Sequence, residues 1–330
     1  MRKAVRYISI VFLVLFMFFI VVGCAPQKDD VMDDAMTDYP QEVIKCVVTF
    51  GAGSVTDLST RIIMKKVSEK IGQNIMIENL PGGGTIVGHT NVAKAKPDGY
   101  TIGIGAFAVE ISLASTEAEI QNLDDLDVLA QLGYYLNGIT VRTDSPWQSL
   151  DDLGKWGREN PGSIIAAPSA TGSITHAWWE LVANHYGIED SGLLATNGGH
   201  DAAIRLLAGD ADVISTPLNN VMEHVEVGNM RVLAVTTPER LEALPDVPTL
   251  DDLGVENPMI HNYLLIAPKG LPEEVREKLL DVVYEVLQDP DLVDELSDLW
   301  MSVNWLVEEE LEQQTLKGRE AIDSIVEAMS

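Results

Sequence analysis

The stretch that decides the fold is Val47-Val48-Thr49-Phe50-Gly51-Ala52-Gly53-Ser54-Val55-Thr56-Asp57, where an apolar strand runs into a small-residue turn and then an amphipathic helix. Small residues leave the backbone N–H groups of such a turn uncovered, and the dipoles of the following helix favour negative charge there. The turn therefore predicts a site for an anion such as a carboxylate. The candidate contacts are Gly51, Ala52, Gly53, Ser54, Thr56 and Asp57. Asp57 also stands where a first-turn carboxylate stabilises a helix without any ligand.

The strand, glycine turn and helix pattern is repeated at Glu78-Asn79-Leu80-Pro81-Gly82-Gly83-Gly84, and the alternation continues along most of the chain. Short apolar strands that alternate with helices predict an α/β fold with mainly parallel sheets. We expect strands at 43–50, 75–78, 101–106, 128–132, 139–141, 164–167, 193–195, 213–215, 231–235 and 264–267. We expect helices at 57–71, 85–94, 150–159, 173–186, 201–208 and 272–287.

Several motifs together resemble one family. They are Glu78-Asn79 with its glycine run, Pro97-Asp98-Gly99-Tyr100-Thr101, Thr171-Gly172-Ser173 with His176, Leu233-Ala234-Val235-Thr236 with Arg240, Leu244-Pro245-Asp246-Val247-Pro248-Thr249 and Ala267-Pro268-Lys269-Gly270-Leu271-Pro272. Over nearly all of Val43 to Leu299 the chain resembles the solute receptors of tripartite tricarboxylate transporters, also called Bug-type receptors. These are extracytoplasmic binding proteins for small carboxylic acids. The resemblance implies a type II-like periplasmic-binding-protein fold, with two lobes and a ligand cleft between them. Lobe one would comprise 40–141 plus 263–330, and lobe two 142–262.

The N-terminus indicates export independently. Three cations precede the apolar run Ile10 to Val22, and Val21-Val22-Gly23-Cys24 has the form of a bacterial lipobox. We expect a lipoprotein signal peptide at 1–23 and lipidation of Cys24, which would hold the protein to the bacterial membrane. The alternative is an uncleaved anchor, but the run is shorter than the roughly 20 residues that span a bilayer. Residues 24–39 are acidic and lack periodicity, so they predict a flexible tether.

The charge excludes one class of partner. The chain carries 22 cationic and 51 acidic side chains, a net charge of −29, and loss of residues 1–23 would make it (22 − 3) − 51 = −32. Such a field repels phosphate backbones, so we expect no nucleic-acid partner. The only cysteine besides Cys24 is Cys46, in an apolar strand, which predicts a small buried hydrophobe and no disulfide. We expect no metal or cofactor.

A second turn, Pro168 to His176, follows a predicted strand and precedes the helix that carries Trp178 and Trp179. Because it also lies at a helix N-terminus, two anion-binding turns would clamp one ligand between the lobes. The resemblance places ligand contacts here, at Ser169, Thr171, Gly172, Ser173 and His176. The alternatives are that Thr171 or Ser173 only caps the helix, and that His176 satisfies a backbone carbonyl instead of donating to a carboxylate.

A third patch contains Asn197 and Gly198, and Phe107 is a further candidate for the cleft wall. The family usually has a bulky residue where Asn197 stands, and an amide there would bond a distal polar group of the ligand. The alternative is ordinary turn chemistry, since Asn-Gly-Gly readily takes positive φ. The chain also departs from the family at its first turn, which usually has proline and paired glycines.

The sequence therefore predicts a receptor that captures a small carboxylate and delivers it to the large and small membrane subunits of a tripartite tricarboxylate transporter. We expect it to be monomeric and not an enzyme, because no nucleophile elbow, metalloprotease motif or P-loop is present. One alternative is the receptor of an ATP-driven importer, or a ligand sensor. Another is a hydrolase that uses Ser173, His176 and Asp57, the residue types of a catalytic triad.

Overall fold

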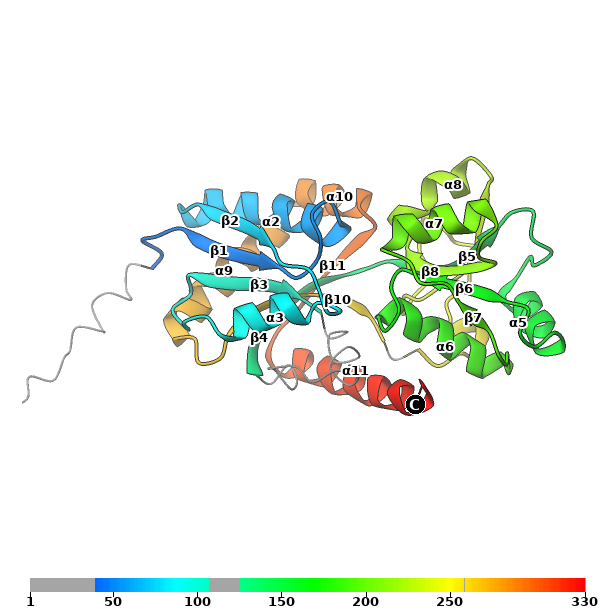
Figure 1. Cartoon of the computed structure of the whole chain (residues 1–330). Coiled ribbons are helices and arrows are strands. Elements are labelled where there is room, and N and C mark those ends of the chain that lie inside the picture. Colours follow the sequence, from blue (N-terminus) through cyan, green and yellow to red (C-terminus); the bar gives the residue numbers. More distant parts are fainter. Residues whose placement is uncertain (1–38, 107–124, 258, 330) are drawn as a thin grey trace, which may run out of the picture. The chain divides into compact units, whose positions relative to one another are not determined.

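The computed structural model describes residues 39–106, 125–257 and 259–329, with side chains described as far as 320. The chain from Pro40 onward forms one compact unit. The predicted signal peptide, Cys24, most of the tether and Phe107 lie outside the described residues. From Pro40 the chain builds two β-sheets, each with helices on both faces (Figure 1). The expected two-lobed α/β fold is thereby confirmed.

The first sheet has six strands in the order β11-β4-β10-β3-β1-β2. Its strands are β1 (Ile44–Val48), β2 (Ile75–Asn79), β3 (Thr101–Gly105), β4 (Leu126–Tyr135), β10 (His261–Pro268) and β11 (Met301–Leu306). Helices α2 (Val55–Ile71), α9 (Glu273–Leu287) and α10 (Pro290–Asp298) contact one another. An apolar cluster around Val47 and Ile266 instead includes side chains of α3 (Ile86–Ala93) and α11 (Glu308–Met329).

The second sheet has five strands in the order β7-β6-β8-β5-β9. They are β5 (Asn137–Arg142), β6 (Ile165–Pro168), β7 (Gly192–Leu193), β8 (Val213–Pro217) and β9 (Met230–Val235). One apolar cluster joins this sheet to α5 (Leu150–Glu159) and α6 (Ile174–Tyr186), and contains the buried Trp178 and Trp179. A second cluster joins it to α7 (Gly199–Ala208), the short helix η2 (Leu218–Asn220) and α8 (Met222–Glu226). A further short helix, η3, spans Asp251–Leu253.

The expectation of mainly parallel sheets is wrong. Four strand pairs are parallel and five are antiparallel. The antiparallel pairs all involve β4, β5 or β10, which are the strands near the crossings between the two sheets. Buried strands are apolar on both faces in either direction, so periodicity does not reveal how they run.

Leu136 is the single residue between β4 of the first sheet and β5 of the second. Its N–H donates to Trp300 O at 2.9 Å, and its carbonyl accepts from Leu218 N at 2.8 Å. Because β5 pairs inside the five-stranded sheet, the predicted lobe boundary at 141 falls after the crossing. We propose that lobe two begins at Asn137, and the return to lobe one at 263 stays a prediction.

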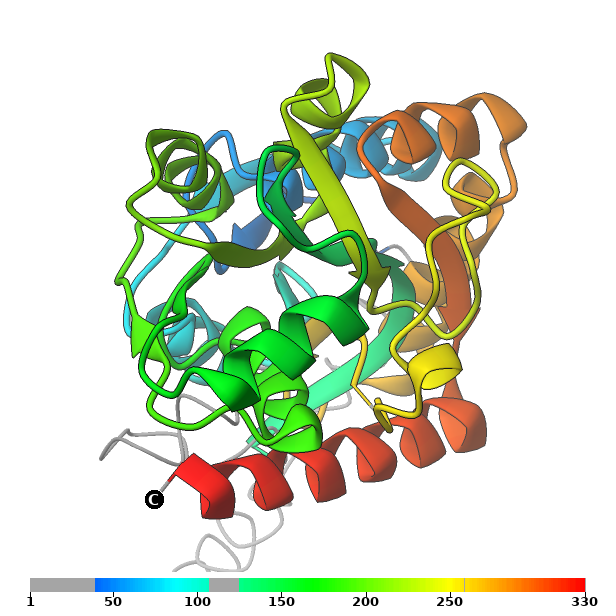
Figure 2. The ribbon, with the colours of Figure 1, turned by 90° about the vertical axis from the view of Figure 1, so that its right-hand side faces the viewer.

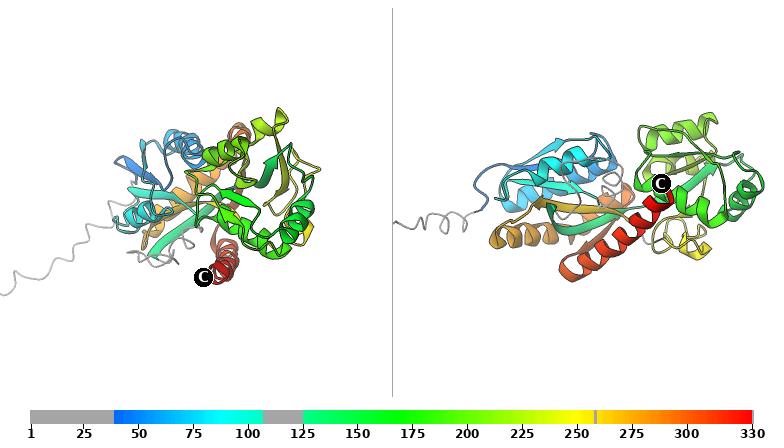
Figure 3. Two further views of the ribbon diagram at one scale, coloured as in Figure 1. Left: turned by 45° about the vertical axis from the view of Figure 1, so that its right-hand side comes forward. Right: turned by 60° about the horizontal axis from the view of Figure 1, so that its bottom comes forward.

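Local sequence explains where the principal helices begin and end. Helix α5 begins at Ser149, whose side chain accepts from Asp152 N in a capping box, and it spans the predicted 150–159. Helix α2 ends at Gly72 in a left-handed conformation that glycine adopts without strain. Helix α11 contacts both β4 and α6, and is drawn in red in Figure 2 and Figure 3.

Cys46 is fully buried in β1, and burial raises the pKa of its thiol to about 12. The prediction of a small buried hydrophobe is therefore confirmed. Within the described ranges, no helix combines the length and apolar character needed to cross a membrane. The same residues contain no cluster of His, Cys, Asp or Glu side chains suited to a metal ion.

Candidate functional site

The first predicted turn lies directly after β1, at the carboxyl end of that parallel strand. Ser54 is the N-cap of α2, and its Oγ accepts from Asp57 N at 3.2 Å. The Oδ2 atom of Asp57 accepts the Gly53 N–H at 2.8 Å, while Gly53 has a left-handed φ of 79°. The expected first-turn carboxylate is confirmed, and the two reciprocal bonds fix the shape of the turn.

The second carboxylate oxygen of Asp57 is also occupied. Oδ1 lies 2.9 Å from Arg61 Nη2 and accepts from Asn79 Nδ2 at 3.0 Å. Asn79 also donates to Phe50 O at 3.1 Å, so the end of β2 is tied to the same turn. Burial alone would raise the pKa of Asp57, but hydrogen bonds from Arg61, Gly53 and Asn79 together lower it. Asp57 is thus an ionised residue that organises the turn, with both oxygens bound inside the protein.

The amides that remain for an anion are those at the start of α2. The N–H groups of Val55 and Thr56 occupy the first two helical positions and have no intrahelical acceptor. The N–H groups of Gly53 and Asp57 are already used. Among the amides at the start of α2, those of Val55 and Thr56 therefore stay available for a carboxylate, with the helix dipole behind them.

The second turn lies between β6 and α6. Ser173 is the N-cap residue, but its side chain does not cap the helix. Its Oγ donates to Ala170 O at 2.7 Å and lies 2.8 Å from Thr175 Oγ1. The alternative in which Ser173 serves as the cap is wrong, and the first amides of α6 gain no acceptor from it.

His176 does not satisfy a backbone carbonyl, so that alternative is wrong, and donation to a ligand carboxylate stays a prediction. Its Nδ1 accepts the Gly172 N–H at 3.2 Å, so in this geometry the ring proton is on Nε2. Nε2 lies 3.2 Å from Glu180 Oε1, within contact distance but without hydrogen-bond alignment. His176 therefore neither satisfies a backbone carbonyl nor faces open solvent; it holds the turn through Gly172.

The third patch is joined to the second turn. The Gly198 N–H donates to Ser169 O at 2.8 Å, which brings the two segments together at the carboxyl ends of β6 and β7. The Asn197 N–H donates to Asp201 Oδ2 at 3.0 Å, while the Asn197 side chain is exposed. Gly198 adopts a φ of 116°, as the turn alternative predicts. In the part of the chain that the structure describes, the side-chain amide of Asn197 makes no contact that holds this turn, so it is available to a ligand.

The sequence-based search missed the end of β8, which joins the same group. Ser169 Oγ donates to Thr216 Oγ1 at 3.0 Å, and Ser215 is buried with no partner for its Oγ among the described residues. A side chain at Gly199 would clash with Thr216 and Asn220. The signal was available in the sequence, because Ser215 and Thr216 end an apolar strand just as Ser169 does.

The residues of the hydrolase alternative are not assembled. Ser173 Oγ donates to a backbone carbonyl, and the nitrogens of His176 face Gly172 and Glu180. Asp57 is bound to Arg61 on a different sheet's helix. No hydrogen bond of the kind that activates a serine joins these three side chains in this structure.

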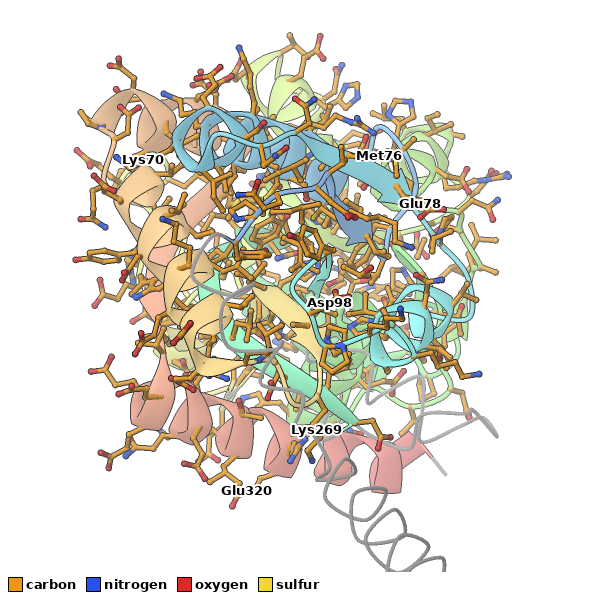
Figure 4. All side chains as sticks on the ribbon, turned by 90° about the vertical axis from the view of Figure 1, so that its left-hand side faces the viewer. Lys70, Met76, Glu78, Asp98, Lys269 and Glu320 are labelled. Carbon is orange, nitrogen blue, oxygen red and sulfur yellow. The ribbon has the colours of Figure 1, made fainter. Side chains whose placement is uncertain are left out.

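A groove of about 480 Å³ lies elsewhere, between α2 and the edge strand β2. It is lined by Arg61, Met64, Lys65, Ser68, Glu69, Asn74, Ile75, Met76 and Ile77. Met76 and Glu78 project from this edge strand (Figure 4). None of the predicted site residues lines the groove, and the helix N-termini have the stronger chemical case for an anion.

Two α/β lobes, each with helix N-termini at the carboxyl ends of parallel strands, define a two-lobed solute-binding protein. Residues 59–327 match the tripartite tricarboxylate transporter family receptor, TctC, and the chain belongs to this family. The resemblance based on the motifs is confirmed. The protein is therefore a solute-binding receptor of a transporter, and it is extracytoplasmic.

Relatives of known sequence and structure agree with this assignment. The chain is 27% identical over 288 residues to the "UPF0065 protein in gbd 5'region" of Cupriavidus necator, covering 86% of this chain and 87% of the relative. It is 29% identical over 266 residues to "Protein BugT" of Bordetella pertussis, covering 78% and 79% of the two chains. A solved periplasmic transporter shares 26% identity at a TM-score of 0.78, covering 87% of this chain and 97% of its own.

Proposed function

We propose that this receptor captures a small carboxylate in a cleft between its lobes and delivers it to the membrane subunits of a tripartite tricarboxylate transporter. The observation that carries the proposal is the pair of helix starts at α2 and α6. The Gly53 N–H is bound by Asp57 in the first turn, and the Gly172 N–H is bound by His176 in the second. The first backbone N–H groups of the two helices stay available to a ligand. Amides of this kind, aligned with a helix dipole, are suited to a carboxylate.

Two structures of the same fold contain dicarboxylates. They are MatC of Rhodopseudomonas palustris with bound malate, at a TM-score of 0.72, and R. palustris Rpa4515 with adipate, at 0.75. Both are 24% identical to this chain and support the class of ligand but not its identity. In a molecule with net charge −29, an anion must be bound by local dipoles and N–H groups rather than by the overall field.

Closure of the lobes supplies the rest of the binding energy in this proposal. Neither turn alone satisfies a carboxylate, and closure would bring both sets of donors to it while excluding water. In this proposal the exposed side-chain amide of Asn197 bonds a distal group of the ligand. The alternative partner is an ATP-driven importer, for which this protein would be the receptor. A gene for an ATPase beside the gene for this protein would favour that alternative.

The proposed receptor is attached to the membrane by a lipid. We infer that Cys24 is lipidated and holds a monomeric receptor to the bacterial membrane, with residues 24–39 as the tether. Labelling with a palmitate analogue should mark the wild-type protein and not Cys24→Ser. An unlabelled wild-type protein would contradict the anchor without affecting the receptor assignment.

Thermal-shift screening against a set of mono-, di- and tricarboxylates tests the binding function. A ligand at 100 times its dissociation constant adds about 2.7 kcal/mol to the free energy of unfolding, which is readily measured. Small-angle scattering should show a smaller radius of gyration with the bound ligand, and mass spectrometry should recover the ligand unchanged. A screen in which no carboxylate stabilises the protein, or in which the ligand is converted, would refute the proposal.

A further inference from the structure

The three predicted site turns share one pattern of contacts between residues spaced four apart. The backbone N–H of one residue donates to a side-chain acceptor four positions later, and that acceptor contacts a third side chain four positions beyond it. We call this pattern the helix-start relay. Its members are Gly53–Asp57–Arg61 on α2, Gly172–His176–Glu180 on α6 and Asn197–Asp201–Arg205 on α7.

The distances are similar in the three relays. From backbone nitrogen to acceptor they are 2.8 Å for Gly53, 3.2 Å for Gly172 and 3.0 Å for Asn197. From acceptor residue to third side chain they are 2.9 Å for Arg61, 3.2 Å for Glu180 and 3.4 Å for Arg205. Residues four apart lie on one face of a helix, so the spacing brings each third side chain onto its acceptor.

Helix α5 shows that the complete relay is not a general consequence of starting a helix. Its Gln148 N–H donates to Asp152 Oδ2 at 3.1 Å, but the position four residues farther on is Trp156. The side chain of Asp152 is instead completed by its capping box with Ser149. The third member is therefore present at the three predicted site turns and absent at this helix, which carries no predicted site.

A first-turn aspartate stabilises its own helix, but beside a bound anion its charge also needs a counter-charge. Asp57 and Asp201 each place a carboxylate next to a turn whose amides would bind a carboxylate, and this repels the ligand. Arg61 lies 2.9 Å from the carboxylate of Asp57 and balances its charge. Arg205 lies 3.4 Å from Asp201 and also donates to Asp210 at 3.0 Å, so it shares its charge between two carboxylates. In the middle relay the acceptor is His176, which is neutral when its Nδ1 accepts an N–H, and there the third residue is not a cation but Glu180.

We propose that Arg61, Glu180 and Arg205 are positioning residues for ligand binding, each acting through the acceptor that holds a site turn. This inference rests on the proposed function. Arg61 balances the charge of Asp57 and holds its rotamer, and Arg205 holds Asp201 in the same way while also binding Asp210. Glu180 restricts the ring of His176 by its contact at 3.2 Å. The turn amides are then ordered before the ligand arrives, which lowers the cost of binding.

Arg61 provides the sharpest test. Its side chain is 49% exposed and fills no core space, but the Asp57 carboxylate is only 4% exposed, so the stability of each variant is measured beside its affinity. Arg240→Gln is a matched control, because Arg240 is also 49% exposed and contacts Asp252 at 2.7 Å, an aspartate that accepts the Thr249 N–H away from the three turns. Arg61→Lys keeps the positive charge, while Arg61→Gln removes it.

Two measurements are made on the intact folded protein. Hydrogen exchange followed by mass spectrometry, without ligand, should show faster exchange across residues 51–56 in Arg61→Gln, with little change in Arg61→Lys or Arg240→Gln. Calorimetry with malate, adipate and citrate as probes should show affinity on the order of tenfold weaker in Arg61→Gln and recovered in part by Arg61→Lys. The loss of affinity in Arg61→Gln should become smaller as the salt concentration rises, because salt screens the repulsion between the ligand and the Asp57 carboxylate.

The outcomes separate this inference from the proposed function. If the wild-type protein binds none of the carboxylates, the proposed function fails, and the exchange measurement still decides whether Arg61 orders the turn. If the wild-type protein binds one of them and Arg61→Gln changes neither exchange nor affinity, the positioning role is overturned. Equal losses in Arg61→Gln and Arg240→Gln would also overturn it, since the effect would then be general.

Discussion

His89 gives the most quantitative prediction, because it is a fully buried base with only one of its two nitrogens bonded. Its side chain is 0% exposed on α3, and Nδ1 donates to Thr85 O at 2.9 Å. Nε2 has no partner among the described residues. Burial lowers the pKa of His89 from 6.5 to about 4, because a charged ring would lose its hydration.

The sign and size of the effect follow from this lowered pKa. The unfolded chain binds the proton below about pH 6.5, whereas the folded protein resists it until about pH 4. The contribution to stability is complete above pH 6.5 and is lost as the pH falls toward 4. The loss is about 2 kcal/mol at pH 5 and about 3 kcal/mol at pH 4.

The assay is urea unfolding of wild type and His89→Leu at pH 7 and pH 5. The leucine variant should lose less stability over this interval, by about 2 kcal/mol. Burial also lowers the pKa of His261 to about 4, so His261 adds its own pH dependence to stability. His261 is present in both proteins, so the difference between them reports His89 alone. Equal pH dependence of the two proteins would show that His89 is hydrated or paired in solution, and the argument would fail.

Three further substitutions test the backbone and the packing around the site. Gly105→Ala would place a Cβ 2.5 Å from His89 Nε2 and should cost about 1–3 kcal/mol in urea unfolding, with partial recovery when His89 is also made alanine. Gly53→Ala should destabilise the protein by about 1 kcal/mol because φ is 79°, whereas Gly51→Ala should be tolerated; equal melting temperatures would contradict this. Trp300 has a φ of 56°, so Trp300→Gly should have a higher melting temperature than Trp300→Ala. Alanine is normally the more stabilising of the two residues, and a higher melting temperature for Trp300→Ala would show that the backbone is not strained here.

Much of the fold could be predicted from local sequence. The limits of α5 follow from Ser149 and Asp152, and a turn of small residues after an apolar strand located the start of α2 to within two residues. Strand direction could not be predicted, because it depends on which strands cross between the sheets. Strand β11, at 301–306, was also missed, since it follows a left-handed Trp300 that no turn signature marks.

The candidate site was predicted as segments but not as contacts. Sequence placed Asp57 at a helix start, and the structure adds that Arg61 and Asn79 occupy its second oxygen. Sequence could not show that His176 accepts from Gly172, because the choice between donor and acceptor depends on the local path of the chain. The polar end of β8 is visible in the sequence, but its contact with Ser169 is not, because the two residues meet only where β6 and β8 pair.

The six-stranded sheet also has a bearing on when the chain can fold. Ile104 of β3 pairs with Leu265, and Tyr135 of β4 pairs with Met301, so the inner strands receive these neighbours only after nearly the whole chain has been synthesised. Pairing between such distant segments folds slowly, because the long connection must be closed before the contacts form. The first lobe of a nascent chain therefore stays incomplete until these late strands have been made, and an incomplete lobe is easier for a secretion channel to thread. The strand order that builds the lobe would thus also keep the chain competent for export.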